Sequence, residues 1–152
     1  MNKQFLISLF LGFLAASAVA DTQVVDSTQS AVIVREADTF ENTGGVTVET
    51  GGITHITGID ANGQANSQWC TGSFASNGDN FLGGAGYCTI VSESGDFLWV
   101  WWRPTAPDAN DWGVIGGTGQ WQGATGGGTT QTTTQMPDGT WISQSKGEIT
   151  TP

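Results

Sequence analysis

The segment Phe97-Leu-Trp-Val-Trp-Trp-Arg103 constrains the fold more than any other part of this chain. Along a β-strand, successive side chains point to opposite faces. The two faces are Phe97, Trp99, Trp101 and Arg103 on one side, and Leu98, Val100 and Trp102 on the other. Both are apolar, whereas a strand with one wet face alternates between apolar and polar residues. The segment therefore predicts a sheet covered on both sides, with one face filling an interior and the other meeting a subunit, a second layer or a ligand. Pro104 and Pro107 are expected to end the strand.

The remainder of the chain has the composition of an all-β protein. It contains 23 glycines, is rich in threonine, and shows no helical spacing of apolar residues after residue 20. Turn-forming sequences such as Asp60–Gly63, Ser92–Asp96 and Pro137–Gly139 separate short β-branched runs. About eight strands joined by tight turns predict a single antiparallel up-and-down barrel, with a β-sandwich as the alternative.

The first 20 residues are predicted to form a secretory signal peptide. Lys3 gives a basic start, Phe5–Leu14 is an apolar run, and Ala18-Val-Ala20 has the small-x-small pattern that precedes a cleavage site. The apolar run is shorter than the roughly 20 residues that a membrane-spanning helix needs. We therefore expect one mature domain, residues 21–152, that is secreted or periplasmic and does not enter a membrane.

The charge of the mature chain argues against several kinds of partner. Without Lys3, the strong cations Arg35, Arg103 and Lys146 stand against fourteen carboxylates, which gives a net charge of about −11. Such a surface repels phosphate backbones and anionic lipids. We expect neither nucleic acid nor a membrane surface as a partner.

The two cysteines, Cys70 and Cys88, are predicted to form a disulfide. Export would place them in an oxidising compartment. They lie in the predicted strands Gln68–Phe74 and Gly86–Val91, and pairing of these strands brings the cysteines almost opposite each other. In the chain-entropy description, a bridge over a loop of this length stabilises the fold by about 3 kcal/mol. A free reactive thiol is the alternative, and two thiols with the only histidine, His55, supply too few ligands for a metal.

The glycine-rich stretch Gly116–Gly128, GGTGQWQGATGGG, could bind phosphate, form a flexible linker or bend a sheet. Read from Gly117, the dinucleotide pattern GxGxxG has Gln122 in place of its third glycine, and no helical pattern follows. A linker is disfavoured because Trp121 and the flanking alternation indicate burial. Glycines within strands mark bulges, sharp coiling and close backbone contacts, which a small closed barrel requires. We expect a bent sheet and no cofactor.

The same stretch resembles the glycine hairpin of the allene oxide cyclase and dirigent barrels, whose pattern is G-G-[ST]-G-x-[FWY]-x-G-[AV]-x-G. The matching residues are Gly116, Gly117, Thr118, Gly119, Trp121, Gly123, Ala124 and Gly126. The resemblance implies an eight-stranded antiparallel barrel with an apolar cavity, no cofactor and commonly a homotrimer. Allene oxide cyclases isomerise an unsaturated epoxide and dirigent proteins steer the coupling of phenoxy radicals, so the implied ligand is a small hydrophobic or aromatic molecule. No catalytic residue of the family lies inside the shared pattern, and none is transferred.

Four residues are candidates for acid/base chemistry inside such a barrel. His55 is a candidate acid or base near neutral pH if its face of the strand lines the cavity. Glu49, Asp60 and Glu148 lie within or next to predicted strands and are the candidate cavity carboxylates. The ordinary alternatives are a partly exposed histidine on a strand and three solvated carboxylates.

Five further residues are candidates for ligand binding. Trp99, Trp101 and Trp102 offer flat apolar surfaces. Tyr87 offers a hydroxyl donor beside the predicted disulfide. Arg103 would hold an anionic ligand or form an ion pair with Glu93 or Asp96. Ordinary packing of the tryptophans is the alternative.

Three functions are compatible with the sequence. The first is a cofactor-free isomerase or cyclase acting on, or steering, a small hydrophobic or aromatic molecule. The second is a non-catalytic, lipocalin-like binding module. The third is a structural or interaction protein whose barrel is filled by its own side chains. The sequence leaves open whether the protein is an enzyme.

Overall fold

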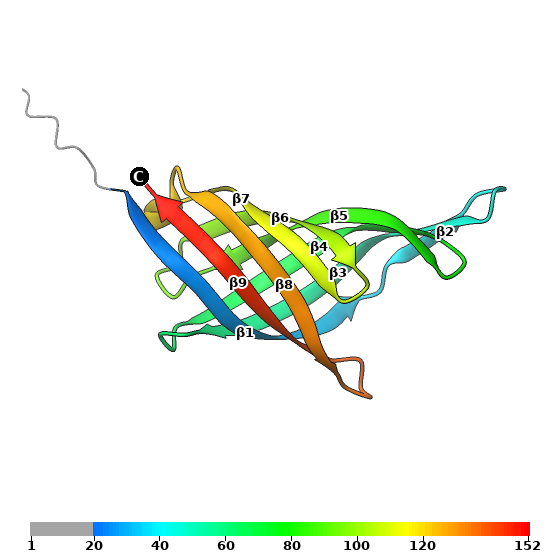
Figure 1. The fold of residues 1–152 in the computed structure, drawn as a ribbon, viewed down its shortest axis with the longest axis horizontal. Coiled ribbons are helices and arrows are strands. Elements are labelled where there is room, and N and C mark those ends of the chain that lie inside the picture. Colours follow the sequence, from blue (N-terminus) through cyan, green and yellow to red (C-terminus); the bar gives the residue numbers. More distant parts are fainter. Residues whose placement is uncertain (1–19) are drawn as a thin grey trace, which may run out of the picture.

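The computed structural model describes residues 20–152, so the predicted signal peptide lies outside the described part of the chain apart from Ala20 (Figure 1). Within residues 20–152 the chain forms nine strands and one short 3-10 helix. These are β1 (Asp21–Arg35), β2 (Asp38–Glu41), β3 (Val46–Asp60), β4 (Ala65–Asn77), β5 (Asn80–Val91), β6 (Phe97–Ala106), β7 (Ala109–Gly117), η1 (Gly119–Trp121), β8 (Thr125–Gln135) and β9 (Trp141–Thr151).

Eight of the strands close into an antiparallel barrel. The order of hydrogen-bonded neighbours is β1-β9-β8-β7-β6-β5-β4-β3, and β1 also pairs with β3. In Figure 1, the first strand lies beside the last, with Asp21 opposite Thr151. Closure removes the unpaired edges that an open sheet would have. The predicted all-β, eight-stranded up-and-down barrel is thus confirmed.

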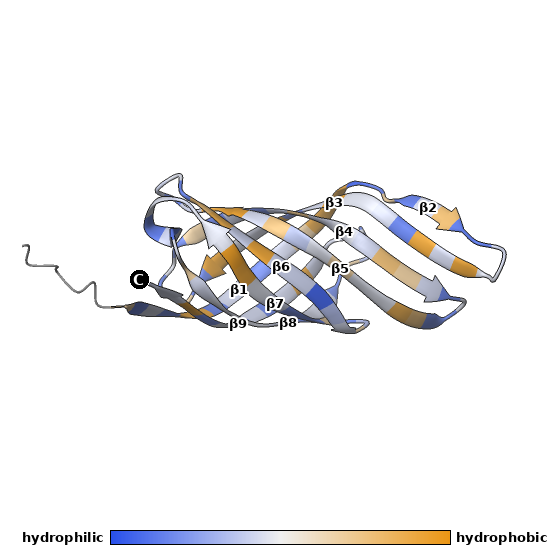
Figure 2. Ribbon diagram, turned by 90° about the horizontal axis from the view of Figure 1, so that it is seen from above, coloured by the Kyte–Doolittle hydropathy of each residue, from blue (hydrophilic) through white to orange (hydrophobic). Residues whose placement is uncertain are grey.

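The ninth strand belongs to an extension that we call the flap, residues 38–50 and 73–85. Here β2 pairs only with β3, and the adjoining parts of β4 and β5 continue past the barrel. β6 pairs with β5 only from Gly86 onward, so residues 80–85 have no neighbour on that side. The flap extends from one end of the barrel in Figure 1, and Figure 2 shows hydrophobic residues along it. Its exposed large apolar side chains are Phe40, Phe74, Phe81 and Leu82. The flap therefore keeps two free edges.

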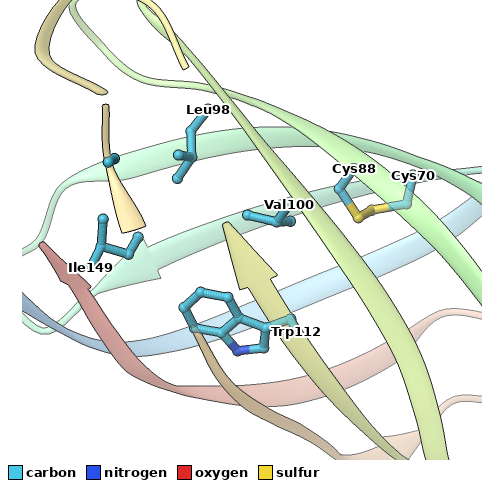
Figure 3. Close-up of a cluster of buried hydrophobic side chains, with 7 residues drawn as sticks. Cys70, Cys88, Leu98, Val100, Trp112 and Ile149 are labelled. Atoms are coloured by element: carbon cyan, nitrogen blue, oxygen red, sulfur yellow. A yellow bond between two sulfur atoms is a disulfide. The ribbon is translucent and has the colours of Figure 1, made fainter. Parts of the chain in front are cut away.

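The buried core lies on the inner face of the barrel. Its largest members are Cys70, Cys88, Leu98, Val100, Trp112 and Ile149, which come from β4, β5, β6, β7 and β9 (Figure 3). In β6 the inward residues are Leu98 and Val100, with Trp102 packed against the same cluster. The other face of β6, with Phe97, Trp99 and Trp101, points outward.

The predicted disulfide is present. Cys70 and Cys88 are directly opposite each other on β4 and β5, with their Cα atoms 4.0 Å apart. The bridge links neighbouring strands across 18 positions of sequence. It lies inside the barrel, where both cysteines are buried.

The prediction that the strand ends at these two prolines is wrong for Pro104 and confirmed for Pro107. β6 continues through Pro104 to Ala106, and the turn falls at Pro107. Pairing of β6 with β5 stops at Trp102, so the missing N–H of Pro104 removes no bond to that neighbour. Pro104 remains opposite Asn110 of β7.

The glycine-rich stretch bends the chain between β7 and β8 and includes η1. Gly119 and Gly123 have positive φ angles of 52° and 76°, which favour glycine. Trp121 packs directly over Gly117, where a Cβ would collide with the Cβ of the tryptophan. In the following strand, a Cβ at Gly128 would collide with the β9 backbone. The stretch brings strands into close contact, in agreement with the sequence-based interpretation.

Candidate functional site

The barrel encloses a cavity of about 620 Å³. This volume lies within the range of about 300–1,000 Å³ that is typical of small-molecule sites. Its walls are the inward residues of the barrel strands, and at one end it reaches the base of the flap, where Phe74 and Glu49 line it.

One wall of the cavity is apolar. It is formed by β4, β5 and β6 through the disulfide, Ile90, Leu98, Val100 and Trp102. Trp102 can lie flat here because β4 and β5 present Gly72 and Gly86 beneath it, and a Cβ at either position would collide with the indole. This wall suits the face of a planar apolar ligand.

The opposite wall combines apolar residues, such as Ala31 of β1 and Ile149 of β9, with uncharged polar side chains. It carries Ser27 and Gln29 of β1, Thr130 and Thr132 of β8, and Ser143 of β9. Thr132 and Ser143 lie within hydrogen-bond distance of each other at 3.4 Å between their oxygens, and the Thr130 hydroxyl donates to Ser145 Oγ at 3.0 Å. The Ser27 Oγ atom is buried and has no partner among the described residues. The wall can donate to, and accept from, hydroxyl or carbonyl groups of a ligand.

The charged lining residues lie at strand ends and on the flap. At the flap end they are Arg35, Glu36 and Glu49, and at the other end they are Asp60 and Glu93. Between these ends, the described residues that line the cavity carry no charge. This uncharged middle section favours an uncharged ligand body, because burying an unpaired charge there would be costly.

The structure places two of the four predicted acid/base residues at the cavity. Glu49 lines its flap end and Asp60 lines the opposite end. On β3 the inward neighbours of His55 are Thr54 and Ile56, so the expectation that the His55 face lines the cavity does not hold. His55 instead stacks on Trp69 with 4.5 Å between ring centroids, and its Nε2 lies 2.9 Å from Ser67 Oγ. Glu148 is likewise absent from the lining, whereas its neighbour Ile149 belongs to it.

The predicted ligand-binding residues divide between the inside and the outside of the barrel. Trp102 lines the cavity. Trp99, Trp101 and Tyr87 are on the outer surface, between 37% and 53% exposed. Arg103 lies 3.5 Å from Asp111 in an exposed ion pair, a different partner from the two expected acids. The glycines that make room for Trp102, Gly72 and Gly86, were the available signal for its inward direction.

No group of three or more His, Cys, Asp and Glu side chains in residues 20–152 is arranged to hold a metal ion. Across the same residues, no helix has the length and hydropathy needed to cross a membrane. The disulfide indicates an oxidising compartment.

A closed antiparallel barrel with an interior cavity defines the structural class of this chain, and solved structures of dirigent proteins share the fold. The pterocarpan synthase dirigent protein GePTS1 aligns with a TM-score of 0.57 and 14% identity, covering 97% of this chain and 98% of that chain. The pterocarpan synthase dirigent protein PsPTS1 aligns with a TM-score of 0.52 and 13% identity, covering 87% and 95%. The sequence matches no protein family and no curated protein. The expected dirigent-like barrel is therefore confirmed as a fold.

Proposed function

We propose that the protein binds a small aromatic molecule inside the barrel and holds it in one orientation. The observation that carries this proposal is the division of the cavity into an apolar wall around Trp102 and a neutral polar wall around Ser143. A planar ring would pack on the first wall while its oxygen substituents bond to the second. Because the two walls differ, a ligand with oxygen substituents on one edge would bind in one preferred orientation.

Binding and steering are better supported than acid/base catalysis. Of the predicted acid/base residues, Glu49 and Asp60 line the cavity, and each lies at one of its ends. An isomerase or cyclase would have to rely on carboxylates at the cavity ends. The fold is shared with proteins named as pterocarpan synthase dirigent proteins, which supports a role toward an aromatic ligand.

We further propose that the mature chain is secreted and that copies associate through the outer face of β6, as a homotrimer or another closed assembly. The predicted signal peptide and the disulfide support secretion. Trp99 and Trp101 support association, because large half-exposed aromatic side chains in a group are typical of interfaces.

A matched pair of substitutions on β8 tests the cavity. Thr130 faces the cavity, whereas its neighbour Thr129 is exposed on the outer face. We expect Thr130→Phe to fill part of the cavity and weaken binding of 2-naphthol at least tenfold, and Thr129→Phe to leave it unchanged. Binding is measured by quenching of tryptophan fluorescence, and thermal melts confirm that both variants are folded. Failure of the wild-type protein to bind 2-naphthol, or equal binding by both variants, would contradict the proposal.

A further inference from the structure

A row of aromatic rings leads from the cavity onto the flap. Trp102 in the barrel stacks on Phe74 of β4, with 5.2 Å between ring centroids and 29° between ring planes. Phe74 in turn packs against Phe81 of β5, with centroids 6.4 Å apart. Phe74 and Phe81 are 42% and 41% exposed. A ligand bound against Trp102 would therefore find a further aromatic surface at the flap end of the cavity.

A carboxylate stands beside this surface. Glu49 of β3 is directly opposite Phe74 of β4, so the two side chains lie on the same face of the sheet. Both line the cavity, and Glu36 lines it at the same end. Among the described residues, Glu49 and Glu36 have no ion pair and no side-chain hydrogen bond, whereas Arg35 lies 3.4 Å from Asp38.

At the opposite end of the cavity, the carboxylates are engaged in hydrogen bonds with the backbone. There, Asp60 Oδ1 accepts hydrogen bonds from the backbone N–H groups of Asn62 and Gln64. Glu93 Oε1 accepts from the N–H of Ala65 at 3.2 Å. These carboxylates hold turns in place. The carboxylates of the flap end, Glu36 and Glu49, make no such hydrogen bond among the described residues, so both oxygens of each can meet a ligand.

We propose that the flap end of the cavity is a subsite for a protonated amine carried by the aromatic ligand. The inference rests on the proposed function, since the aromatic body of the same ligand occupies the barrel. The ammonium group would lie between the carboxylate of Glu49 and the ring of Phe74, which attracts cations over its face. The net charge of −10 raises the local concentration of cations further.

The location of the subsite fits the cost of burying charge. An ammonium ion in the neutral middle of the barrel would lose its hydration without gaining a counter-charge. At the flap, Glu49 is exposed, so the ammonium group keeps part of its water while the aromatic body is buried. An exposed ion pair and an exposed cation–π contact together correspond to roughly tenfold in affinity.

Three probes of one shape test the subsite: 1-naphthylmethylamine, 1-naphthalenemethanol and 1-naphthoate. Binding to the full mature protein is measured by calorimetry at low ionic strength and neutral pH. We expect the amine to bind about tenfold more tightly than the alcohol, and the carboxylate to bind most weakly. Salt should reduce the advantage of the amine, because it screens exposed charges.

The Glu49→Gln variant should bind the amine and the alcohol with nearly equal affinity. Asp79→Asn is the matched control, because it removes one negative charge from the exposed turn between β4 and β5 without touching the cavity lining. The control should keep the full preference for the amine. Thermal melts of both variants establish that the barrel is intact.

The outcomes separate the subsite from the proposed function. Equal binding of amine and alcohol by the wild-type protein, or an unchanged preference in Glu49→Gln, would overturn the amine subsite and leave the aromatic cavity standing. Loss of the preference in Asp79→Asn as well would show a general effect of surface charge and would also overturn it. Absence of binding by all three probes would reject both the subsite and the proposed function.

Discussion

The two faces of β6 have almost the same composition and different environments. The inner face carries Leu98 and Val100, which are 3% and 5% exposed. The outer face carries Phe97, Trp99 and Trp101, which are 37% to 41% exposed. On the outer face Phe97 and Trp99 lie nearly parallel, with 5° between their rings. The inner face is thus packed within the barrel, whereas the outer face lacks a cover within one copy of residues 20–152.

The comparison teaches that apolar residues on a strand have two uses. On the inner face their burial stabilises the barrel and shapes the cavity. On the outer face the same residue types stabilise one copy of the chain less, and we propose that they are used for association. Substitutions on the inner face should therefore cause the larger loss of stability. Substitutions on the outer face should mainly change self-association.

The largest effect is expected for Leu98→Ala. Removing three side-chain carbons from a buried leucine leaves a cavity, and we expect a loss of about 3 kcal/mol in the free energy of unfolding. The value is obtained from urea denaturation followed by circular dichroism. A loss below about 1 kcal/mol would mean that the inner face of β6 is not packed as described.

A smaller effect is expected for Gly86→Ala, which tests the contact beneath Trp102. The added Cβ would collide with the indole and with the Thr71 carbonyl, and we expect a loss of about 2 kcal/mol from overpacking. Gly116→Ala is the control, because a Cβ at Gly116, opposite the outward Trp99, meets nothing within 4 Å. Equal melting temperatures for the two variants would contradict the close contact at Gly86.

The smallest effect on stability is expected for Trp99→Thr on the outer face. Threonine keeps a high preference for strands, so at low protein concentration we expect a loss of about 1 kcal/mol or less. The same substitution should reduce self-association, which sedimentation velocity measures over a range of concentrations. An oligomer that survives Trp99→Thr and Trp101→Thr together would place the interface elsewhere.

Much of the barrel could be predicted from the sequence because its signals are local. The two apolar faces of residues 97–103, turn sequences such as Pro137–Gly139 and the spacing of Cys70 and Cys88 each depend on a few neighbouring residues. These signals gave the all-β class, the up-and-down barrel and the disulfide. The glycine stretch between residues 116 and 128 was interpreted correctly because it lacks the residues that a phosphate site needs.

The orientation of each strand could not be predicted in the same way. Alternation divides β6 into two sets of residues but does not tell which set faces inward, since closure of the barrel decides this through distant pairings. His55 was a candidate catalytic residue only if its face of the strand lines the cavity. That face of β3 does not line the cavity. The flap was not predicted because β2 is only four residues long. Four residues are too few to show a recognisable strand pattern, and only the pairing with β3 reveals the strand.

Barrel closure also has a consequence for biosynthesis. β1 takes one neighbour from β3, which follows soon after it, and the other from β9, which ends at Thr151. β1 thus waits for its second neighbour until β9 has been synthesised. During that interval the nascent chain presents an incomplete sheet that can pair with other chains. Chaperones that shield this edge until release should therefore raise the yield of correctly closed protein.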